Sequence, residues 1–425
     1  MLDPKLIRND PDTVRRGLER RGAEDLLPHV DEILELDAQR RSALNEVNDL
    51  KAERNEVSKR IGDMKKRGED ADDLIAEMRR VGDRIGDLDG RVSEAEDRIE
   101  ELLLVIPNLP LDEVPEGGED ANEVVRSWGE PKSYEFELKP HWDLGEALDI
   151  LDLVRGAKVS GSGFPVLKGA GARLQRGLID WMLNVHTQEH GYCEVRVPYL
   201  VTRESLTATG QLPKFADESY ASERDDLWLI PTAEVPVTNL HRDELFAPDD
   251  LPVRYTTYSP CFRREAGAAG KDTRGLIRVH QFDKVELVRF ETPDDARQAL
   301  EDLTGEAEKI LQLLELPYRI VLLSTGDLGF SAAMTYDLEV WAPGVEEWLE
   351  VSSCSTFTDY QARRANIRFR PAHGEKPEFV HTLNGSALAL PRLMIALLES
   401  YQQPDGSVQI PEILRPHVGL DALLP

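Results

Sequence analysis

The sequence has 425 residues, of which 40 % are hydrophobic, so two or three folded domains with a sizeable core are possible. Asp and Glu number 80 against 51 Lys and Arg, and the resulting formal net charge of −29 excludes a general electrostatic affinity for nucleic acid. We attribute this charge to a cytoplasm of high salt concentration, in which only a local cluster of basic residues indicates a partner.

Long apolar segments and clustered cysteines are both absent from the sequence. No run of 18 apolar residues occurs, and Cys193, Cys261 and Cys354 are far apart. We therefore expect a cytoplasmic enzyme that binds no membrane, contains no structural disulfide and holds no zinc.

Two long helices are predicted in the first quarter of the sequence. From Leu74 to Ile106 apolar residues recur at alternating intervals of four and three, which is a heptad seam. An upstream segment between Ala43 and Met64 matches this seam less regularly, and a polar turn at residues 65–73 separates the two. The pattern predicts an antiparallel coiled-coil hairpin at about residues 30–106, within an N-terminal domain of residues 1–110. At about 1.5 Å per residue, each arm should be some 45 to 50 Å long.

Basic residues gather in the half of the hairpin that includes its tip. A hairpin of this kind can serve as a spacer or as a dimerisation element. In an acidic chain, however, a basic cluster indicates an anionic partner. The cluster consists of Lys51, Arg54, Lys59, Arg60, Lys65, Lys66, Arg67, Arg79, Arg80 and Arg84.

Beyond the hairpin, residues 105–123 are rich in Pro, Gly and acidic residues and resemble a linker. Helical and strand patterns then alternate irregularly through a second domain, residues 111–425. Helices are predicted at 172–190 and 293–316, and strands are predicted up to Pro198, near Trp228, Tyr255 and Arg278, and from Tyr336 onward. This mixture indicates an α+β fold with a largely antiparallel sheet.

Two predicted strands between Tyr258 and Val288 carry charges where core strands carry apolar residues. Alternate residues of a strand share a face, so one face of the second strand should present Arg278, His280, Phe282, Lys284 and Glu286. The preceding strand presents Arg263 and Glu265, and the loop between the strands contains Gly267, Gly270, Lys271 and Gly275. An exposed face with solvated salt bridges is one explanation. A purine stacked on the phenylalanine, with its polyphosphate held by the guanidinium groups, is the other.

These residues also carry a resemblance. "FRREAG" followed by "RVHQFDKVE" resembles motif 2 of the class II aminoacyl-tRNA synthetases, in the form found in the seryl-tRNA synthetase family. The similarity extends over nearly the whole chain, from "MLDPKLIRND" and "GLERRG" to "VQIPEILRPHVG". It implies a class II catalytic domain and ATP-dependent ligation of L-serine to tRNA(Ser), and by family to tRNA(Sec), through a seryl-adenylate.

The same resemblance implies how the chain assembles and how it binds tRNA. The helix ending near His190 and the following "GYCEVRVPYLV" resemble motif 1, which implies a homodimer. The hairpin would bind tRNA by backbone and shape. The residues that we expect to take part are Lys51, Arg54, Arg60, Lys65, Lys66, Arg79 and Arg80.

By resemblance, motif 2 binds ATP. Arg263 should contact the α-phosphate, Glu265 the adenine amino group, and Arg278 the triphosphate, while Phe282 should stack on the base. Arg264 and Val279 belong to the same predicted ATP site. Because the attacking carboxylate and the α-phosphoryl group are both anionic, such a site must supply fixed positive charge.

By the same resemblance, serine should bind beside the nucleotide. Its predicted contacts are Thr232, Ala233 and Glu234 of "LIPTAEVP", together with Glu286, Asn384 and Ser386. A serine site needs an acceptor for the ammonium group and partners for the hydroxyl group, and two glutamates can supply both. Which glutamate takes which group is open at this point.

"EEWLEVSSCST" is interpreted in two ways. A Ser- and Thr-rich strand end is common at the edge of a sheet. The family resemblance instead assigns Glu350 as a magnesium ligand, with Ser353 beside it and Val351 and Ser352 in the ATP site. Magnesium takes carboxylate and phosphate oxygens, so one glutamate and one serine next to ATP are chemically sufficient.

Arg392 lies in a run of mostly apolar residues that predicts a buried helix. A buried arginine needs an anion, which is either a structural carboxylate or, as in motif 3 of the class II family, the γ-phosphate of ATP. Ala387 and Pro391 depart from the family, where glycines are commoner. We assign catalysis to Arg263, Arg392 and Glu350 through positioning and charge stabilisation, because no side chain resembles a nucleophile.

The sequence is also compatible with two alternative functions. The first is a class II paralogue that activates an amino acid and loads it onto a carrier protein, although such a protein has no need of a tRNA-binding arm. The second is a coiled-coil interaction protein with an inactive synthetase domain, although every expected ATP-contacting position holds the expected chemistry.

Overall fold

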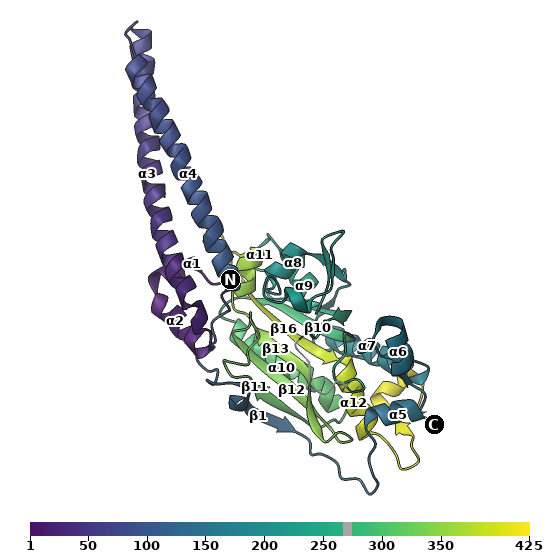
Figure 1. Cartoon of the computed structure of the whole chain (residues 1–425). Coiled ribbons are helices and arrows are strands. Elements are labelled where there is room, and N and C mark those ends of the chain that lie inside the picture. The colour runs from purple at the N-terminus through teal and green to yellow at the C-terminus, as the bar shows by residue number, and fades with distance from the viewer. Residues whose placement is uncertain (267–273) are drawn as a thin grey trace. The chain divides into compact units, whose positions relative to one another are not determined.

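The computed structural model describes residues 1–266 and 274–425, which form two units, residues 1–107 and 108–425 (Figure 1). Gly267, Gly270 and Lys271, named above in the loop of motif 2, lie outside the described residues. No helix among the residues that are described is long and apolar enough to cross a membrane.

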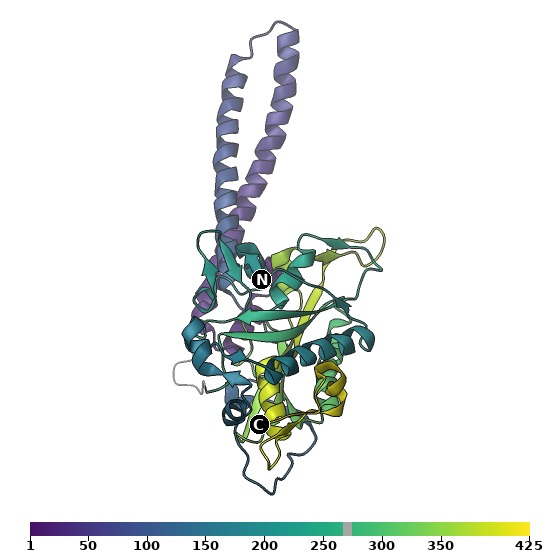
Figure 2. The same ribbon diagram turned by 90° about the vertical axis from the view of Figure 1, so that its right-hand side faces the viewer.

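In the first unit two long helices, α3 (Leu27–Lys66) and α4 (Asp72–Val105), form a hairpin (Figure 2). The seam predicted in α4 is buried between Ile85 and Leu102, and part of it packs against α3. The coiled-coil hairpin is therefore confirmed. At about 1.5 Å per residue α3 is about 60 Å long, longer than predicted, because it begins earlier than the seam suggested.

Two short helices and a 3₁₀ turn precede the hairpin: α1 (Pro4–Asn9), α2 (Pro11–Arg20) and η1 (Glu24–Leu26). A buried carboxylate holds the base of α3 to α1. Asp37 accepts hydrogen bonds from Arg8 Nε at 2.7 Å, Arg41 Nε at 2.9 Å and Arg40 Nη2 at 3.1 Å. Burial alone would raise the pKa of Asp37, but the surrounding guanidinium groups lower this pKa below its ordinary value.

The second unit is built on an eight-stranded sheet, in which all described neighbours pair antiparallel except β4 and β9. This confirms the predicted α+β fold with a largely antiparallel sheet. From one edge to the other the strands are β1 (Glu123–Trp128), β11 (Tyr318–Leu322), β12 (Met334–Ala342), β13 (Glu347–Thr356), β16 (His381–Ala389), β10 (Gln281–Glu291), β9 (Val253–Phe262) and β4 (Cys193–Glu194).

Helices and short strands surround this sheet. The larger helices are α7 (Ala170–Gln188), α10 (Ala296–Leu313) and α12 (Leu390–Ser400). The smaller ones are η2 (Glu119–Ala121), α5 (His141–Ala147), α6 (Leu153–Ser160), α8 (Arg203–Ala208), η3 (Ala216–Glu218), α9 (Glu234–Thr238), η4 (Asn239–His241), α11 (Tyr360–Ala365), η5 (Glu412–Leu414) and α13 (Arg415–Val418). The short strands are β2 (Leu151–Asp152), β3 (Val166–Leu167), β5 (Leu200–Thr202), β6 (Ala221–Ser222), β7 (Leu227–Leu229), β8 (Leu245–Phe246), β14 (Arg368–Phe369), β15 (Glu378–Phe379), β17 (Val408–Gln409) and β18 (Ala422–Leu423).

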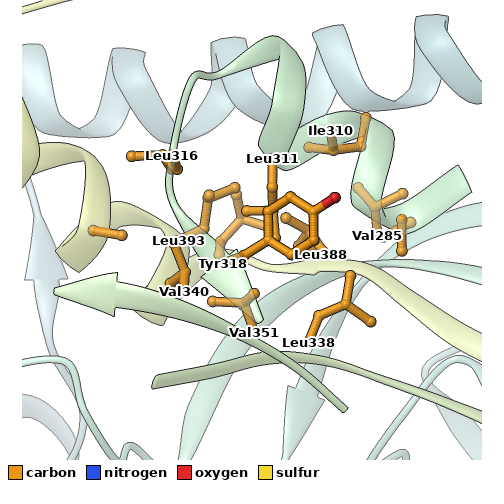
Figure 3. Close-up of a cluster of buried hydrophobic side chains, with 14 of the residues drawn as sticks. Val285, Ile310, Leu311, Leu316, Tyr318, Leu338, Val340, Val351, Leu388 and Leu393 are labelled. Atoms are coloured by element: carbon orange, nitrogen blue, oxygen red, sulfur yellow. The ribbon is translucent and has the colours of Figure 1, made fainter. Parts of the chain in front are cut away.

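One face of the sheet carries the hydrophobic core, which α10 and α12 cover (Figure 3). Val285 of β10, Leu338 of β12, Leu311 of α10 and Leu393 of α12 are all fully buried there. Because side chains alternate along a strand, burial of this face leaves the neighbouring residues of β10, β13 and β16 on the opposite face. The opposite face is where the polar residues of the predicted site lie.

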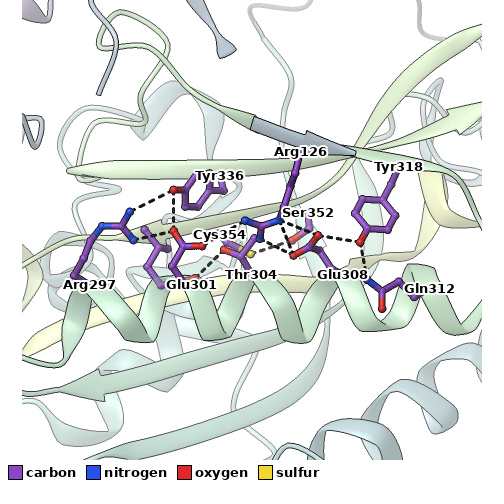
Figure 4. Close-up of polar contacts among 11 residues, drawn as sticks. Arg126, Arg297, Glu301, Thr304, Glu308, Gln312, Tyr318, Tyr336, Ser352 and Cys354 are labelled. Atoms are coloured by element: carbon purple, nitrogen blue, oxygen red, sulfur yellow. Dashed lines mark hydrogen bonds and ion pairs between the residues drawn. The ribbon is translucent and has the colours of Figure 1, made fainter. Parts of the chain in front are cut away.

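The edge strand β1 is attached to α10 by a polar network (Figure 4). Arg126 Nη2 lies 2.6 Å from Glu308 Oε2, and Tyr318 OH donates to Glu308 Oε1 at 2.9 Å. A second pair on the same helix joins Arg297 and Glu301, which also accepts a hydrogen bond from Tyr336 OH. The contact of Arg126 with Glu308 binds to α10 an edge strand whose own side chains are mostly exposed.

Three local predictions were wrong. The strand predicted near Arg278 begins only at Gln281, so residues 274–280 lie outside the sheet ladder. The strand predicted up to Pro198 is limited to β4. The predicted linker is bound to the second unit from Asn108 onward, whose Nδ2 donates to Ser331 O at 2.9 Å and Phe357 O at 2.8 Å. For the linker, these contacts of Asn108, and not the local sequence pattern, decide the conformation.

Candidate active site

A cavity of about 820 Å³ lies over the polar face of the sheet. Strands β10, β12, β13 and β16 line it, together with residues 276–279, the start of α12, and a segment between Thr209 and Ser219. Its volume suits a nucleotide together with a small amino acid.

Basic and aromatic residues of motif 2 form one part of this cavity. The Arg263 guanidinium lies 5.2 Å from the centroid of the Phe282 ring, and its Nε donates to Pro231 O at 3.3 Å. Arg278 Nη1 donates to Glu265 Oε2 at 2.7 Å. The cavity is therefore lined by a flat ring with one guanidinium group over it and by a second guanidinium group, a combination that suits a purine and its phosphates.

Arg392 is the third residue of α12, and its side chain is 25 % exposed. The expectation of a buried arginine was wrong, because the residue lies in the first turn of the helix at the cavity wall. Its Nη1 donates to Glu350 O at 2.8 Å and lies 3.3 Å from Glu350 Oε2. The arginine predicted to hold a phosphate and the glutamate predicted to bind magnesium are thus side by side.

The predicted serine contacts Thr232, Glu234, Glu286, Asn384 and Ser386 all line the cavity, and all are buried. Three of them lie on two adjacent strands: Glu286 of β10 pairs with Ser386 of β16, and Asn384 is two residues before Ser386.

Lys284 connects these residues by its ammonium group, a role that its position on the charged strand face did not predict. Its Nζ donates to Thr232 Oγ1 at 2.9 Å and forms an ion pair with Glu286. The hydroxyl of Thr232 in turn donates to Glu286 Oε2 at 3.3 Å.

The part of the cavity around Lys284 has two buried carboxylates, Glu234 and Glu286, but one buried ammonium. Burial, with the negative charge of Glu286 next, raises the pKa of Glu234 to about 7, although Gln361 and Lys284 oppose the rise. Burial also raises the pKa of Glu286, against the ammonium of Lys284 and the guanidinium of Arg263. A cationic group on the substrate would compensate this excess of negative charge.

Gln361 orients Glu234 and was also missed. Its Nε2 donates to Glu234 Oε1 at 2.5 Å and to Thr209 O at 3.3 Å, while its Oε1 accepts from Thr382 Oγ1 at 2.7 Å. All hydrogen-bonding atoms of this buried amide are therefore used, which fixes its orientation. No sequence signal pointed to it, because the helix α11 that carries it approaches the site only in the folded chain.

The predicted magnesium ligands Glu350 and Ser353 line the cavity, and a third group there is Asp337. Its Oδ1 is buried without a hydrogen-bond partner, and burial and the charge of Glu350 raise its pKa well above the ordinary value. No group of three or more His, Cys, Asp or Glu side chains that could hold a metal ion is found among residues 1–266 and 274–425. Glu350 and Ser353 fit magnesium, provided that phosphate oxygens complete its coordination.

Three predicted residues do not line the cavity. Arg264 is exposed and its backbone N–H donates to Glu218 O at 2.9 Å. Ala233 is fully buried. Ser352 is also buried, and its Oγ donates to Ser386 O at 2.5 Å, so its side chain binds the backbone of β16. Val279 and Val351 do line the cavity.

Comparison with known proteins identifies the family. Residues 1–110 match the family described as the seryl-tRNA synthetase N-terminal domain, and residues 215–401 match the tRNA synthetase class II core domain of the G, H, P, S and T enzymes. The chain is 57 % identical over 420 residues to a serine–tRNA ligase of Gemmatimonas aurantiaca, which covers 99 % of both chains. The chain belongs to the seryl-tRNA synthetase family. A family member from Thermotoga maritima, also a serine–tRNA ligase, is 55 % identical over 426 residues and 100 % of both chains.

Solved structures of the seryl-tRNA synthetase family agree. The enzyme of Pyrococcus horikoshii complexed with ATP superposes with a TM-score of 0.95 at 42 % identity, over 100 % of both chains. The cytoplasmic enzyme of Naegleria fowleri in complex with AMP gives a TM-score of 0.89 at 29 % identity, over 100 % of this chain and 99 % of that one. The class II fold expected from motif 2 is confirmed, whereas the high-salt interpretation of the net charge stays a prediction.

Proposed function

We propose that the protein ligates L-serine to tRNA(Ser), and by family to tRNA(Sec), in two steps that use ATP. A carboxylate oxygen of serine attacks the α-phosphorus of ATP, the bond to the bridging oxygen breaks, and pyrophosphate leaves. A hydroxyl of the 3′-terminal ribose of the tRNA, the 3′-hydroxyl in class II enzymes, then attacks the carbonyl carbon of the seryl-adenylate, and AMP leaves. The observation that carries the proposal is one cavity that joins an arginine- and aromatic-rich part to a buried group of two glutamates and one lysine.

The nucleotide part of the cavity supports adenylation by positioning and charge. Arg263 and Arg392 supply positive charge where the phosphoryl group becomes more anionic, and Phe282 supplies a surface for the base. Glu350 and Ser353 would hold Mg²⁺, which when bound neutralises phosphate charge. The pairs Arg278–Glu265 and Arg392–Glu350 must open to exchange carboxylate for nucleotide contacts.

The charge balance supports a specific placement of serine. Glu286 is already paired with Lys284, whereas Glu234 makes no ion pair among the described residues. We therefore assign the serine ammonium to Glu234. The serine hydroxyl then faces the uncharged side chains of Asn384 and Ser386, two residues of β16 that line the same cavity.

The arm is the proposed tRNA contact. Residues 51–84 carry ten basic and nine acidic side chains, whereas the rest of the chain carries 41 basic and 71 acidic ones. The tip half of the hairpin is thus nearly neutral in a strongly anionic chain, so a polyanion meets its smallest repulsion there. We propose that Lys51, Arg54, Arg60, Lys65, Lys66, Arg79 and Arg80 contact the tRNA backbone.

Assembly and location complete the proposal. We propose a homodimer, because α7 and the strand after it match motif 1 by resemblance. Since the substrates of translation are cytoplasmic, we place the enzyme in the cytoplasm.

Serine-dependent exchange of labelled pyrophosphate into ATP, with threonine and alanine as controls, tests the function. We expect exchange with serine and little with either control. Charging of tRNA(Ser) measured beside exchange separates a tRNA ligase from a paralogue that loads a carrier protein. Exchange without charging would favour the paralogue, and absence of both would indicate an inactive synthetase domain.

A further inference from the structure

A buried histidine beside the cavity holds the backbone of the segment that carries Arg278. Residues 274–280 lie outside the sheet ladder, so their position depends on other hydrogen bonds. Two of these bonds come from side chains. Leu276 N–H donates to His141 Nε2 at 3.0 Å, and Ile277 O accepts from Arg392 Nε at 3.1 Å.

The protonation of His141 follows from its partners. The ring is fully buried, and its Nδ1 lies 2.9 Å from Glu399 Oε1, which also accepts the backbone N–H of His141 at 2.8 Å. Because Nε2 accepts a backbone N–H, that nitrogen carries no proton. The ring proton therefore lies on Nδ1 and points at the carboxylate.

Glu399 is itself fixed by backbone donors. Its Oε2 accepts the N–H groups of Gly344 at 2.8 Å and Val345 at 3.2 Å, and the side chain is fully buried. A carboxylate with both oxygens bonded in this way has one orientation, and it imposes that orientation on the imidazole.

The residues next to Leu276 are suited to the close approach of the His141 ring to this segment. Gly275 has φ +65°, and a Cβ atom there would lie 2.1 Å from His141 Nε2. The guanidinium of Arg274 lies over the ring of Trp142 at 4.4 Å. Two consecutive residues of α5 therefore contact Arg274 and Leu276 at the start of this segment.

Helix α12 is the common support of these contacts. Arg392 and Glu399 are seven residues apart, about two helical turns, so one rigid element binds Ile277 directly and Leu276 through the imidazole. We infer that His141 is a positioning residue for ATP: by accepting the Leu276 N–H, it holds Arg278 at the place where the triphosphate binds. The inference rests on the proposed function, which gives Arg278 its ligand.

The effect should be confined to the nucleotide. Glu286, Asn384 and Ser386 lie on strands β10 and β16, where ladder hydrogen bonds fix the backbone independently of residues 274–280. Loss of the anchor should therefore raise the KM for ATP and leave the KM for serine unchanged.

Two substitutions distinguish the acceptor role of His141 Nε2 from the donor role of its Nδ1. His141→Gln places an amide oxygen near the position of Nε2 and can still accept the Leu276 N–H, whereas His141→Asn retains a donor near Nδ1 but is too short to reach. We expect His141→Asn to raise the KM for ATP about tenfold and His141→Gln to raise it at most about twofold. His417→Asn is the matched control, because His417 also contacts a carboxylate, that of Asp180, but on the surface. This substitution should change neither KM.

Hydrogen–deuterium exchange at the Leu276 amide gives a readout that is independent of activity. Slow exchange in the unmodified protein and in His141→Gln, with fast exchange in His141→Asn, is the expected result. Should His141→Asn fail to fold, amide exchange still decides, because an unprotected Leu276 amide in the unmodified protein or in His141→Gln would overturn the inference.

An unprotected Leu276 amide in the unmodified protein, an equal rise of both KM values in His141→Asn, or unchanged kinetics in that variant would each overturn the inference. Failure of the proposed function is distinguishable, since it would abolish serine-dependent exchange in the unmodified protein while the amide measurement still reports on the anchor.

Discussion

The affinity for serine should depend on pH through Glu234. The pKa of this carboxyl is raised to about 7, by burial first and by the charge of Glu286 second, so it is mostly protonated at pH 6 and mostly ionised at pH 8. The serine ammonium needs the ionised form, and binding therefore releases a proton. The KM for serine should fall about tenfold between pH 6 and pH 8.

A neutral substitution tests the assignment. Glu234→Gln keeps an amide oxygen that can accept the hydrogen bond from Gln361, but it has no charge and does not titrate. Because a hydrogen bond to a charged group contributes about 1.5–3 kcal/mol, the KM for serine at pH 8 should rise about 10- to 100-fold, and its pH dependence should disappear. Pyrophosphate exchange at saturating ATP measures both, with Glu347→Gln on the exposed end of β13 as the control.

The stability of the fold should decrease with rising pH, whereas the affinity for serine should increase. A carboxyl whose pKa in the folded protein lies above its ordinary value of 4.5 stabilises the fold in its protonated form, and this contribution is lost as the pH rises through about 7. Without serine, Glu234→Gln should therefore be more stable than the unmodified protein at pH 8, by up to about 3 kcal/mol, and equally stable at pH 4.5. A serine KM that does not vary with pH, or a variant that keeps the pH dependence, would refute the reasoning.

Three further predictions concern the arm, the magnesium ligand and the core. Removing residues 54–66 and 72–84, equal lengths of α3 and α4, should leave pyrophosphate exchange intact and reduce tRNA charging, and equal survival of both would show that the arm does not bind tRNA. Glu350→Gln should raise the Mg²⁺ concentration needed for half-maximal exchange about tenfold, whereas an unchanged Mg²⁺ titration would contradict its assignment as a ligand. Leu338→Ala should lower the free energy of unfolding by about 2–5 kcal/mol in a denaturant titration, and a loss below about 1 kcal/mol would mean that this part of the core repacks.

The features that the sequence predicted well are those set by a short repeat. The seam of α4 repeats every seven residues, and burial from Ile85 to Leu102 follows it. The same applies to β10, where the strand period separates Lys284 and Glu286 from the core residues Val285 and Leu287. In both cases each residue is placed by its neighbours along the chain.

The features that the sequence missed depend on contacts between distant segments. Residues 274–280 continue the strand pattern, but they are bound to His141 outside the sheet ladder, and the strand begins only at Gln281. The apolar run around Arg392 gave no sign that the arginine lies in the first turn of its helix. Lys284 was visible on the charged face, but its bond to Thr232 spans 52 residues and could not be inferred from either segment.

The order of the strands has a consequence for biosynthesis. The cavity draws on residues from Glu119 to Arg392, and the strand β16 and the start of helix α12 come last among them. A nascent chain on the ribosome therefore has no adenylation site until almost the whole polypeptide has emerged. An incomplete product of translation cannot consume ATP or serine, even though its coiled-coil hairpin, made first and stabilised by local contacts, can already be folded.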